Sequence, residues 1–109
     1  MSKDKAIKLI YAYKENFMIK PDLKTSNRIF RKRCAEHTVV DMLVKDIINN
    51  EYIDPLESVQ QDCSKFKKWS CLNVNDIHSK ECFLDAENVA CDILAMLETY
   101  ETDRRYKYE

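Results

Sequence analysis

Apolar residues recur at helical spacing along most of this chain, and the first such stretch covers residues 3–17. The positions that share one face repeat every three or four residues, and they are Ala6, Ile7, Ile10, Tyr11, Tyr13 and Phe17. A helix is therefore expected here, with Ser2 as its N-cap. Pro21 cannot continue a helix and disfavours helical backbone at the residue before it. We therefore expect residues 18–22 to form the first connection.

Residues 26–49 continue the pattern as either one long helix or two shorter ones. Thr25 or Ser26 can cap its start. β-branched residues lower helix propensity at the point where the apolar stripe also shifts, so a break or kink near Glu36–Thr38 is favoured over a continuous helix. Asn49-Asn50 predicts the end, since asparagine tolerates the left-handed backbone of a C-cap better than any residue except glycine.

The strongest local signal in the chain is a helix start at Asp54-Pro55-Leu56-Glu57. It places an N-capping Asp before Pro at the first helical position, with Glu at the third. The helix that follows is expected to end near Trp69, and residues 70–78 are expected to be irregular. A last helix is predicted to start within Ser79–Asp85 and to run to about Thr102. Its broad apolar face indicates the most buried helix of the protein.

Together these stretches predict an all-α protein, a single compact bundle of four or five helices without a β-sheet. The domain is expected to span residues 1–102, and the charged residues 103–109 are expected to form a fraying tail. No apolar run approaches the roughly 18 residues of a membrane span. The first residues also lack the apolar core of a signal peptide, so a cytoplasmic location is expected. The broad apolar stripes can pack within one chain or between two, which leaves a homodimer open.

The chain contains no glycine. Phosphate-binding loops, dinucleotide-binding turns, EF-hand loops and nucleophile elbows all depend on glycine, so these sites are excluded. Cys34 and His37 share a helical face, but no third group or oxyanion-hole motif accompanies them. We therefore expect no catalytic residues and no enzymatic activity. Scarce glycine and proline with abundant lysine are also typical of AT-rich genes, such as those of phages, viruses and mobile elements.

The cysteines are odd in number, and they are Cys34, Cys63, Cys71, Cys82 and Cys91. An odd set without an export signal is typical of free thiols in a reducing compartment, where cysteine packs as a small apolar residue. His78 and Cys82 have the spacing of one zinc-ligand pair, but no second pair exists. Neither a metal nor another cofactor is therefore expected.

Charge is segregated along the sequence, although the net charge is only −1. The net charge is +7 over residues 1–35, −6 over residues 36–64, +3 over residues 65–68 and −5 over residues 69–109. Such segregation either pairs helices within the bundle or presents opposed faces to partners. We interpret the acidic band, which includes Asp62, as mostly a solvated surface in contact with the basic N-terminal helices.

These charges and the aromatic residues beside them define two candidate partner-binding surfaces. The basic surface consists of Arg28, Arg31, Lys32, Lys65, Lys68 and Trp69. The acidic surface consists of Glu51, Asp54, Glu57, Tyr100, Tyr106 and Tyr108. Tyr and Trp are enriched at protein interfaces. We therefore expect a small non-enzymatic protein that acts by binding another protein, as an inhibitor, immunity protein or adaptor.

The alternative is a regulator that binds nucleic acid through the basic second helix. Its phosphate contacts would come from Arg28, Arg31, Lys32 and Arg33. Domains that bind nucleic acid usually carry a basic excess, whereas this chain has a pI of about 6.1. Nucleic acid is therefore the less favoured partner.

Overall fold

The structure is a computed structural model that describes the backbone of residues 1–70 and 77–108 and the side chains of residues 1–68 and 80–103. Within those residues the chain is helical and has no strand. The four helices are α1 (Lys3–Phe17), α2 (Asn27–Asn49), α3 (Pro55–Ser70) and α4 (Ile77–Tyr108). The all-α prediction is confirmed, with four helices in one compact bundle.

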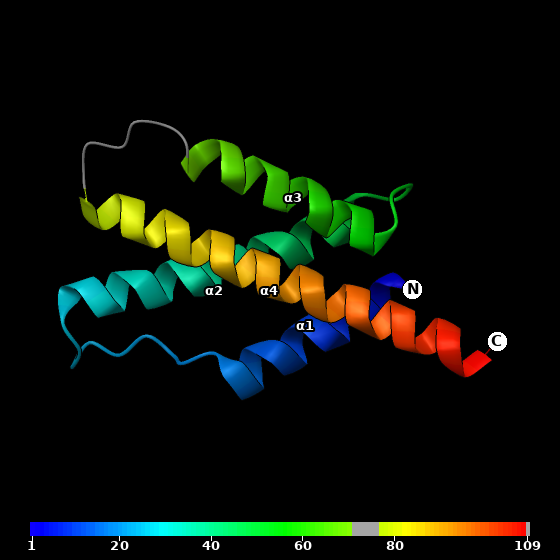
Figure 1. Cartoon of the computed structure of the whole chain (residues 1–109). Coiled ribbons are helices and arrows are strands. Elements are labelled where there is room, and N and C mark those ends of the chain that lie inside the picture. The colour runs from blue at the N-terminus through cyan, green and yellow to red at the C-terminus, as the bar shows by residue number, and fades with distance from the viewer. Residues whose placement is uncertain (71–76, 109) are drawn as a thin grey trace.

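Helix α4 is the central helix of the bundle (Figure 1). It packs against all three other helices, and most extensively against α2 and α3. In Figure 1, α3 lies on one side of α4, and α1 lies on the other side with the start of α2. The second half of α2 passes behind α4, so that the core forms where the four helices meet.

The core consists mainly of aliphatic side chains, which come from every helix. Its largest fully buried apolar side chains are Ile10, Val39, Val40, Leu43, Ile47, Val59, Ile93 and Leu97. Burial of this apolar surface is the main favourable contribution to folding. None of the described helices is long and apolar enough to cross a membrane.

Helix α2 runs without interruption from Asn27 to Asn49, so the predicted break is wrong. The Thr38 hydroxyl donates to the Cys34 carbonyl at 2.8 Å, which satisfies this side chain inside the helix. Val39 and Val40 are buried against the other helices. Burial of these side chains therefore outweighs their low helix propensity.

The helix ends need no left-handed residue. Asn50 caps α2 at the expected place, but with φ −93° and ψ 88°, so the predicted left-handed cap is wrong. Met18 likewise ends α1 in extended backbone. In both cases the cap N–H donates to the carbonyl four residues earlier. No described residue has a positive φ, which shows how these helices end without glycine.

The helix starts follow the sequence closely. Ser2 caps α1, Ser26 caps α2, and Pro55 is the first residue of α3. Helix α4 starts at Ile77 and extends to Tyr108, so both predicted ends of the last helix are wrong. The irregular stretch expected between α3 and α4 falls mainly on residues 71–76, which lie outside the described residues. The fraying expected for the tail stays a prediction.

Replacing the α2 cap, Ser26→Ala, is expected to lower the free energy of unfolding by about 1 kcal/mol. The Ser26 hydroxyl accepts from the Ile29 N–H at 3.4 Å, and alanine would leave that N–H to solvent. Ser64→Ala is the matched control, because the exposed Ser64 hydroxyl donates only to the Gln60 carbonyl within α3. Urea unfolding of both variants measures the difference. Equal stability of the two would contradict the assigned cap.

Candidate functional site

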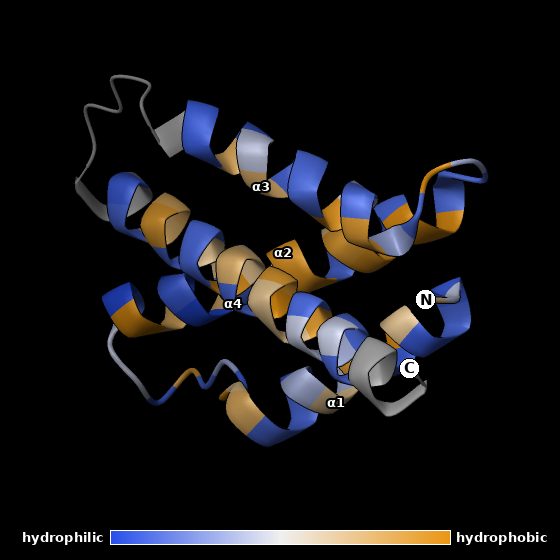
Figure 2. Cartoon of the chain, turned by 45° about the vertical axis from the view of Figure 1, so that its right-hand side comes forward, coloured by the Kyte–Doolittle hydropathy of each residue, from blue (hydrophilic) through white to orange (hydrophobic). Residues whose placement is uncertain are grey.

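Several large apolar side chains are exposed at the end of α1, in the connection that follows and at the start of α2. The exposed fractions are 74% for Phe17, 62% for Ile19, 86% for Leu23 and 42% for Ile29. Figure 2 shows hydrophobic colour on the last turn of α1 and along the connection that follows. A contiguous exposed apolar patch is typical of an interaction site, whereas single exposed apolar residues are ordinary.

An open groove with a volume of about 360 Å³ is lined by three of these side chains, Phe17, Ile19 and Ile29, whereas Leu23 lies outside its lining. Its apolar lining is Tyr13, Phe17, Met18, Ile19, Ile29 and Val89, and its polar lining is Lys32, Arg33, Glu36, Asp85, Asn88 and Asp92. We call it the α1–α2 groove, although α4 contributes one wall. The rings of Tyr13 and Phe17 are in contact, with centroids 5.5 Å apart.

The connection that borders the groove is held in place by polar contacts. The His37 ring lies with Nε2 3.0 Å from the Ile19 carbonyl, which ties the connection to α2. Asp22 organises the turn, because its carboxylate accepts from the Lys24 N–H at 2.9 Å and its carbonyl accepts from the Thr25 hydroxyl at 2.6 Å. Leu23 is therefore presented to solvent by a defined turn.

The α4 wall of the groove is acidic. Lys32 forms an ion pair with Asp85 at 3.5 Å, and the Tyr13 hydroxyl donates to Asp92 at 3.5 Å. Burial and the neighbouring Asp85 raise the pKa of Glu36 above its usual value. Burial together with Asp92 and Glu36 also raises the pKa of Tyr13. These shifts agree with an excess of negative charge along this wall.

The predicted basic surface is divided by α4. Arg28 donates to both carboxylate oxygens of Glu81 at 2.7 and 2.6 Å, so this guanidinium is engaged within the protein. Arg31 is exposed nearby on α2. Lys65 and Lys68 lie on α3, and the first turns of α4 separate α3 from the start of α2 (Figure 2).

Other contacts further limit the basic surface. Lys65 lies 3.8 Å from Asp62 of its own helix. The side chain of Trp69 lies outside the described residues. The structure thus brings Arg28, Arg31 and Lys32 together on α2, but two of these three cations already pair with acids of α4.

The predicted acidic surface lies at the opposite end of the bundle. Glu51 and Asp54 are exposed at the turn between α2 and α3, and Glu57 is exposed in the first turn of α3. Asp54 accepts from the Leu56 N–H at 3.4 Å. Tyr100 is half-buried on α4, and the Lys5 ammonium lies 5.2 Å from its ring centroid.

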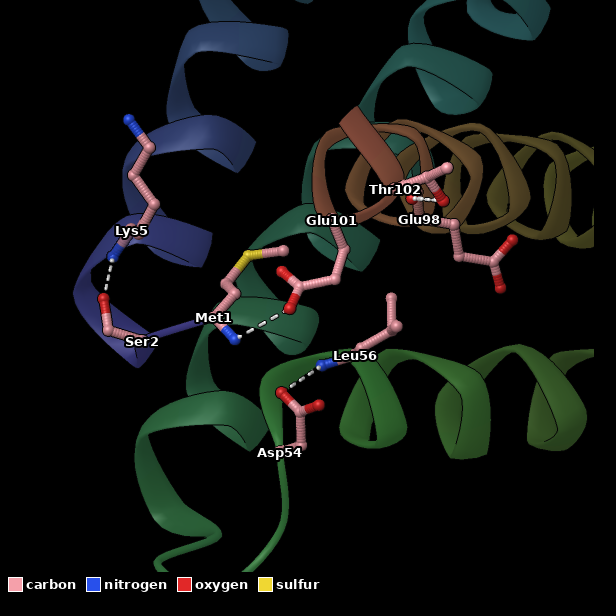
Figure 3. Close-up of polar contacts among 8 residues, drawn as sticks. All are labelled: Met1, Ser2, Lys5, Asp54, Leu56, Glu98, Glu101 and Thr102. Carbon is pink, nitrogen blue, oxygen red and sulfur yellow. Dashed lines mark hydrogen bonds and ion pairs between the residues drawn. The ribbon is translucent and has the colours of Figure 1, made fainter. Parts of the chain in front are cut away.

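The chain start closes this end of the bundle (Figure 3). The amino group of Met1 lies 3.4 Å from Glu101 near the end of α4, with the start of α3 beside them. The side chains of Tyr106 and Tyr108 lie outside the described residues. The structure therefore brings together the acidic turn, the chain start and the later part of α4.

A buried acid that lies beside a second, half-buried acid was missed by the sequence interpretation. Asp62 is 2% exposed on α3, so its assignment to a solvated acidic band is wrong. Its Oδ2 has no partner unless a proton is shared with the neighbouring Asp46 of α2. Burial and Asp46 raise the pKa of Asp62 from 3.8 to about 7. Asp62 follows Val59 by three residues and so lies on the apolar stripe of α3, and this spacing was the sequence signal for its burial.

The α1–α2 groove was also missed as a site. The basic and acidic surfaces were chosen for charge and aromatic content, whereas the exposed apolar residues here include Ile19 and Leu23. Both belong to a connection that contains Pro21, and connections are normally polar. Two large apolar residues in such a segment indicate an exposed apolar surface, and the sequence prediction did not use this signal.

The cysteines differ in their surroundings. Cys34, Cys82 and Cys91 are half-buried, whereas Cys63 is buried in the core. Burial, with Cys91 beside it, raises the pKa of Cys63 to about 12. Within the described residues no group of three or more potential ligands could hold a metal ion. His78 and Cys82, which have the spacing of a zinc-ligand pair in the sequence, are not tested as a pair, because the His78 side chain lies outside the described residues.

Cys63 is expected to be the slowest of these four thiols to react with iodoacetamide at pH 8. The thiolate is the reacting species, and a pKa of about 12 leaves little of it at that pH. Time-resolved alkylation followed by peptide mass spectrometry measures each rate, with Cys91 as the neighbouring comparison. Labelling of Cys63 as fast as Cys91 in the folded protein would contradict its burial.

Comparisons with known proteins returned no relative of this chain: no protein-family model, curated protein or solved structure matches it.

Proposed function

We propose that this chain acts by binding another protein, as an inhibitor, immunity protein or adaptor, and that the docking face consists of the α1–α2 groove and the connection between α1 and α2 that carries Leu23. The observation that carries the proposal is that Phe17, Ile19 and Ile29 line this groove and are exposed, while Leu23 of the adjoining connection is 86% exposed. Burying these side chains against a partner is favourable because it removes apolar surface from water.

The polar contacts of the connection support the same proposal. The contact of His37 with the Ile19 carbonyl and the turn at Asp22 hold the connection in one arrangement. A preorganised surface loses less conformational entropy on binding than a flexible one. Half of the residues that line the groove are apolar and half are polar, so the groove offers both apolar contact and polar groups that can orient a partner.

Nucleic acid finds less support as a partner. Phosphate binding needs cations that are free to pair with phosphate. Arg28 and Lys32 of α2 instead pair with Glu81 and Asp85 of α4. A partner would have to break these ion pairs before it could use the charges.

Site-specific photo-crosslinking tests the docking face. Separate variants carry p-benzoylphenylalanine in place of Leu23, in place of Arg31, or in place of Tyr52, which is 97% exposed at the turn between α2 and α3. Irradiation in cells that naturally contain the protein is expected to give a protein adduct from position 23 and none from position 52. Adducts from position 52 or position 31 but not from position 23 would contradict the proposed face.

A further inference from the structure

Three carboxylates line the α1–α2 groove, and among the described residues one ion pair, that of Lys32 with Asp85, involves them. Glu36 comes from α2, and Asp85 and Asp92 come from α4. Lys32 pairs with Asp85 at 3.5 Å. Arg33 also lines the groove, but it forms no ion pair with any of the three within the described part of the chain.

Asp92 is the acid with the weakest partner. Its contact in the described structure is the hydroxyl of Tyr13, a neutral donor at 3.5 Å. Glu36 in turn faces Asp85, and Lys32 and His37 lie near it. A further cation in the groove would therefore interact favourably with Asp92 and Glu36 together.

The aromatic lining adds a second feature that favours a cation. The rings of Tyr13 and Phe17 lie 5.5 Å apart at the edge of the groove, and Phe17 is 74% exposed. The face of an aromatic ring attracts ammonium and guanidinium groups. The chain already contains one such contact, where the Lys5 ammonium lies 5.2 Å from the Tyr100 ring centroid.

We infer that the α1–α2 groove receives a lysine or arginine side chain of the partner protein, flanked by apolar residues of the same segment. The basic group lies between Asp92, Glu36 and the Tyr13 ring, and the flanking residues cover Ile19 and Ile29. This inference rests on the proposed function. It adds the chemistry of the partner segment, which the exposed apolar side chains alone do not specify.

The test uses n-butylammonium chloride as the probe and 1-butanol, which has the same carbon chain, as its neutral counterpart, both titrated into the whole chain and followed by amide NMR. The cation is expected to shift the amides of residues 13–17, 29–36 and 85–92. Its affinity is expected to exceed that of the alcohol by about fivefold, the effect of one partly exposed ion pair.

Two double variants with the same change of charge complete the test. Glu36→Gln with Asp92→Asn is expected to remove the preference for the cation, whereas Glu51→Gln with Glu57→Gln, at the far end of the bundle, leaves it intact. Dispersed NMR spectra show that each variant is folded. The inference is overturned if the alcohol binds equally well, if both double variants weaken the cation alike, or if no groove amide shifts.

These outcomes are separate from those of photo-crosslinking. A partner adduct at position 23 without a preference for the cation in the groove would overturn the partner chemistry and leave the proposed function standing. A cation preference with an adduct only at position 52 would overturn the docking face itself.

Discussion

Asp62→Asn is expected to make the protein more stable at pH 8 by about 2 kcal/mol and to remove most of the pH dependence of stability between pH 4 and pH 8. Asp62 is 2% exposed and faces Asp46, and its pKa is about 7 in the folded protein against an ordinary 3.8. The folded state therefore binds this proton more tightly than the unfolded state does.

The sign of the pH dependence follows from that raised pKa. The stabilising contribution of the protonated acid is complete below about pH 4 and is lost as the pH rises through about 7. Asparagine is neutral at every pH and its amide can donate to Asp46, so it keeps the contact without the charge. Lys65 lies 3.8 Å from Asp62, and its positive charge makes the ionisation of Asp62 less destabilising in the natural chain.

Urea unfolding at several pH values measures this effect. Asp41→Asn is the matched control, because Asp41 is an exposed acid of α2 that pairs with Lys14 at 3.5 Å. Its variant is expected to keep the pH dependence of the natural chain. Some dependence is expected to remain in Asp62→Asn as well, since the pKa of Glu36 is raised in the same direction. A natural chain that becomes more stable from pH 6 to pH 8 would contradict the raised pKa of the buried Asp62.

Phe17→Ser and Leu23→Ser are each expected to weaken partner binding at least about 30-fold, or about 2 kcal/mol. These side chains are 74% and 86% exposed in the free protein, so serine costs the fold little. In the complex they become the buried apolar anchors, and their removal forfeits that burial. The affinity of the photo-captured partner for each purified variant is the quantity to measure.

Tyr52→Ser is the control for this pair. Tyr52 is 97% exposed but lies at the turn between α2 and α3, away from the groove. The Tyr52→Ser variant is expected to bind the partner with the same affinity as the natural chain. Thermal unfolding of all three variants separates a loss of contact from a loss of folding. If the Phe17 and Leu23 variants bind normally while Tyr52→Ser does not, the docking face lies at the other end.

The helices followed from local rules in the sequence, with exceptions that have physical causes. Ser2, Ser26 and Pro55 start helices because capping and the fixed φ of proline act within one turn of backbone. The continuity of α2 did not follow, because it depends on the burial of Val39 and Val40 against other helices. Local propensity contains no information about that packing.

The candidate site followed from the sequence only in part. Lys32 was expected on a binding surface and does line the groove, but its pairing with Asp85 is a contact between distant segments that periodicity cannot reveal. Asp62 was assigned to solvent because single acids are rarely buried. Its burial depends on the approach of Asp46 from another helix, which again is set by the three-dimensional packing.

The most direct test of the proposed docking face is amide hydrogen exchange of the chain with and without its partner. Binding at the α1–α2 groove predicts slower exchange in residues 13–33, where the end of α1, the connection and the start of α2 form the groove. Residues 50–57 at the opposite turn are expected to exchange at unchanged rates. Protection confined to residues 50–57, with none in residues 13–33, would contradict the assignment of the groove as the binding face.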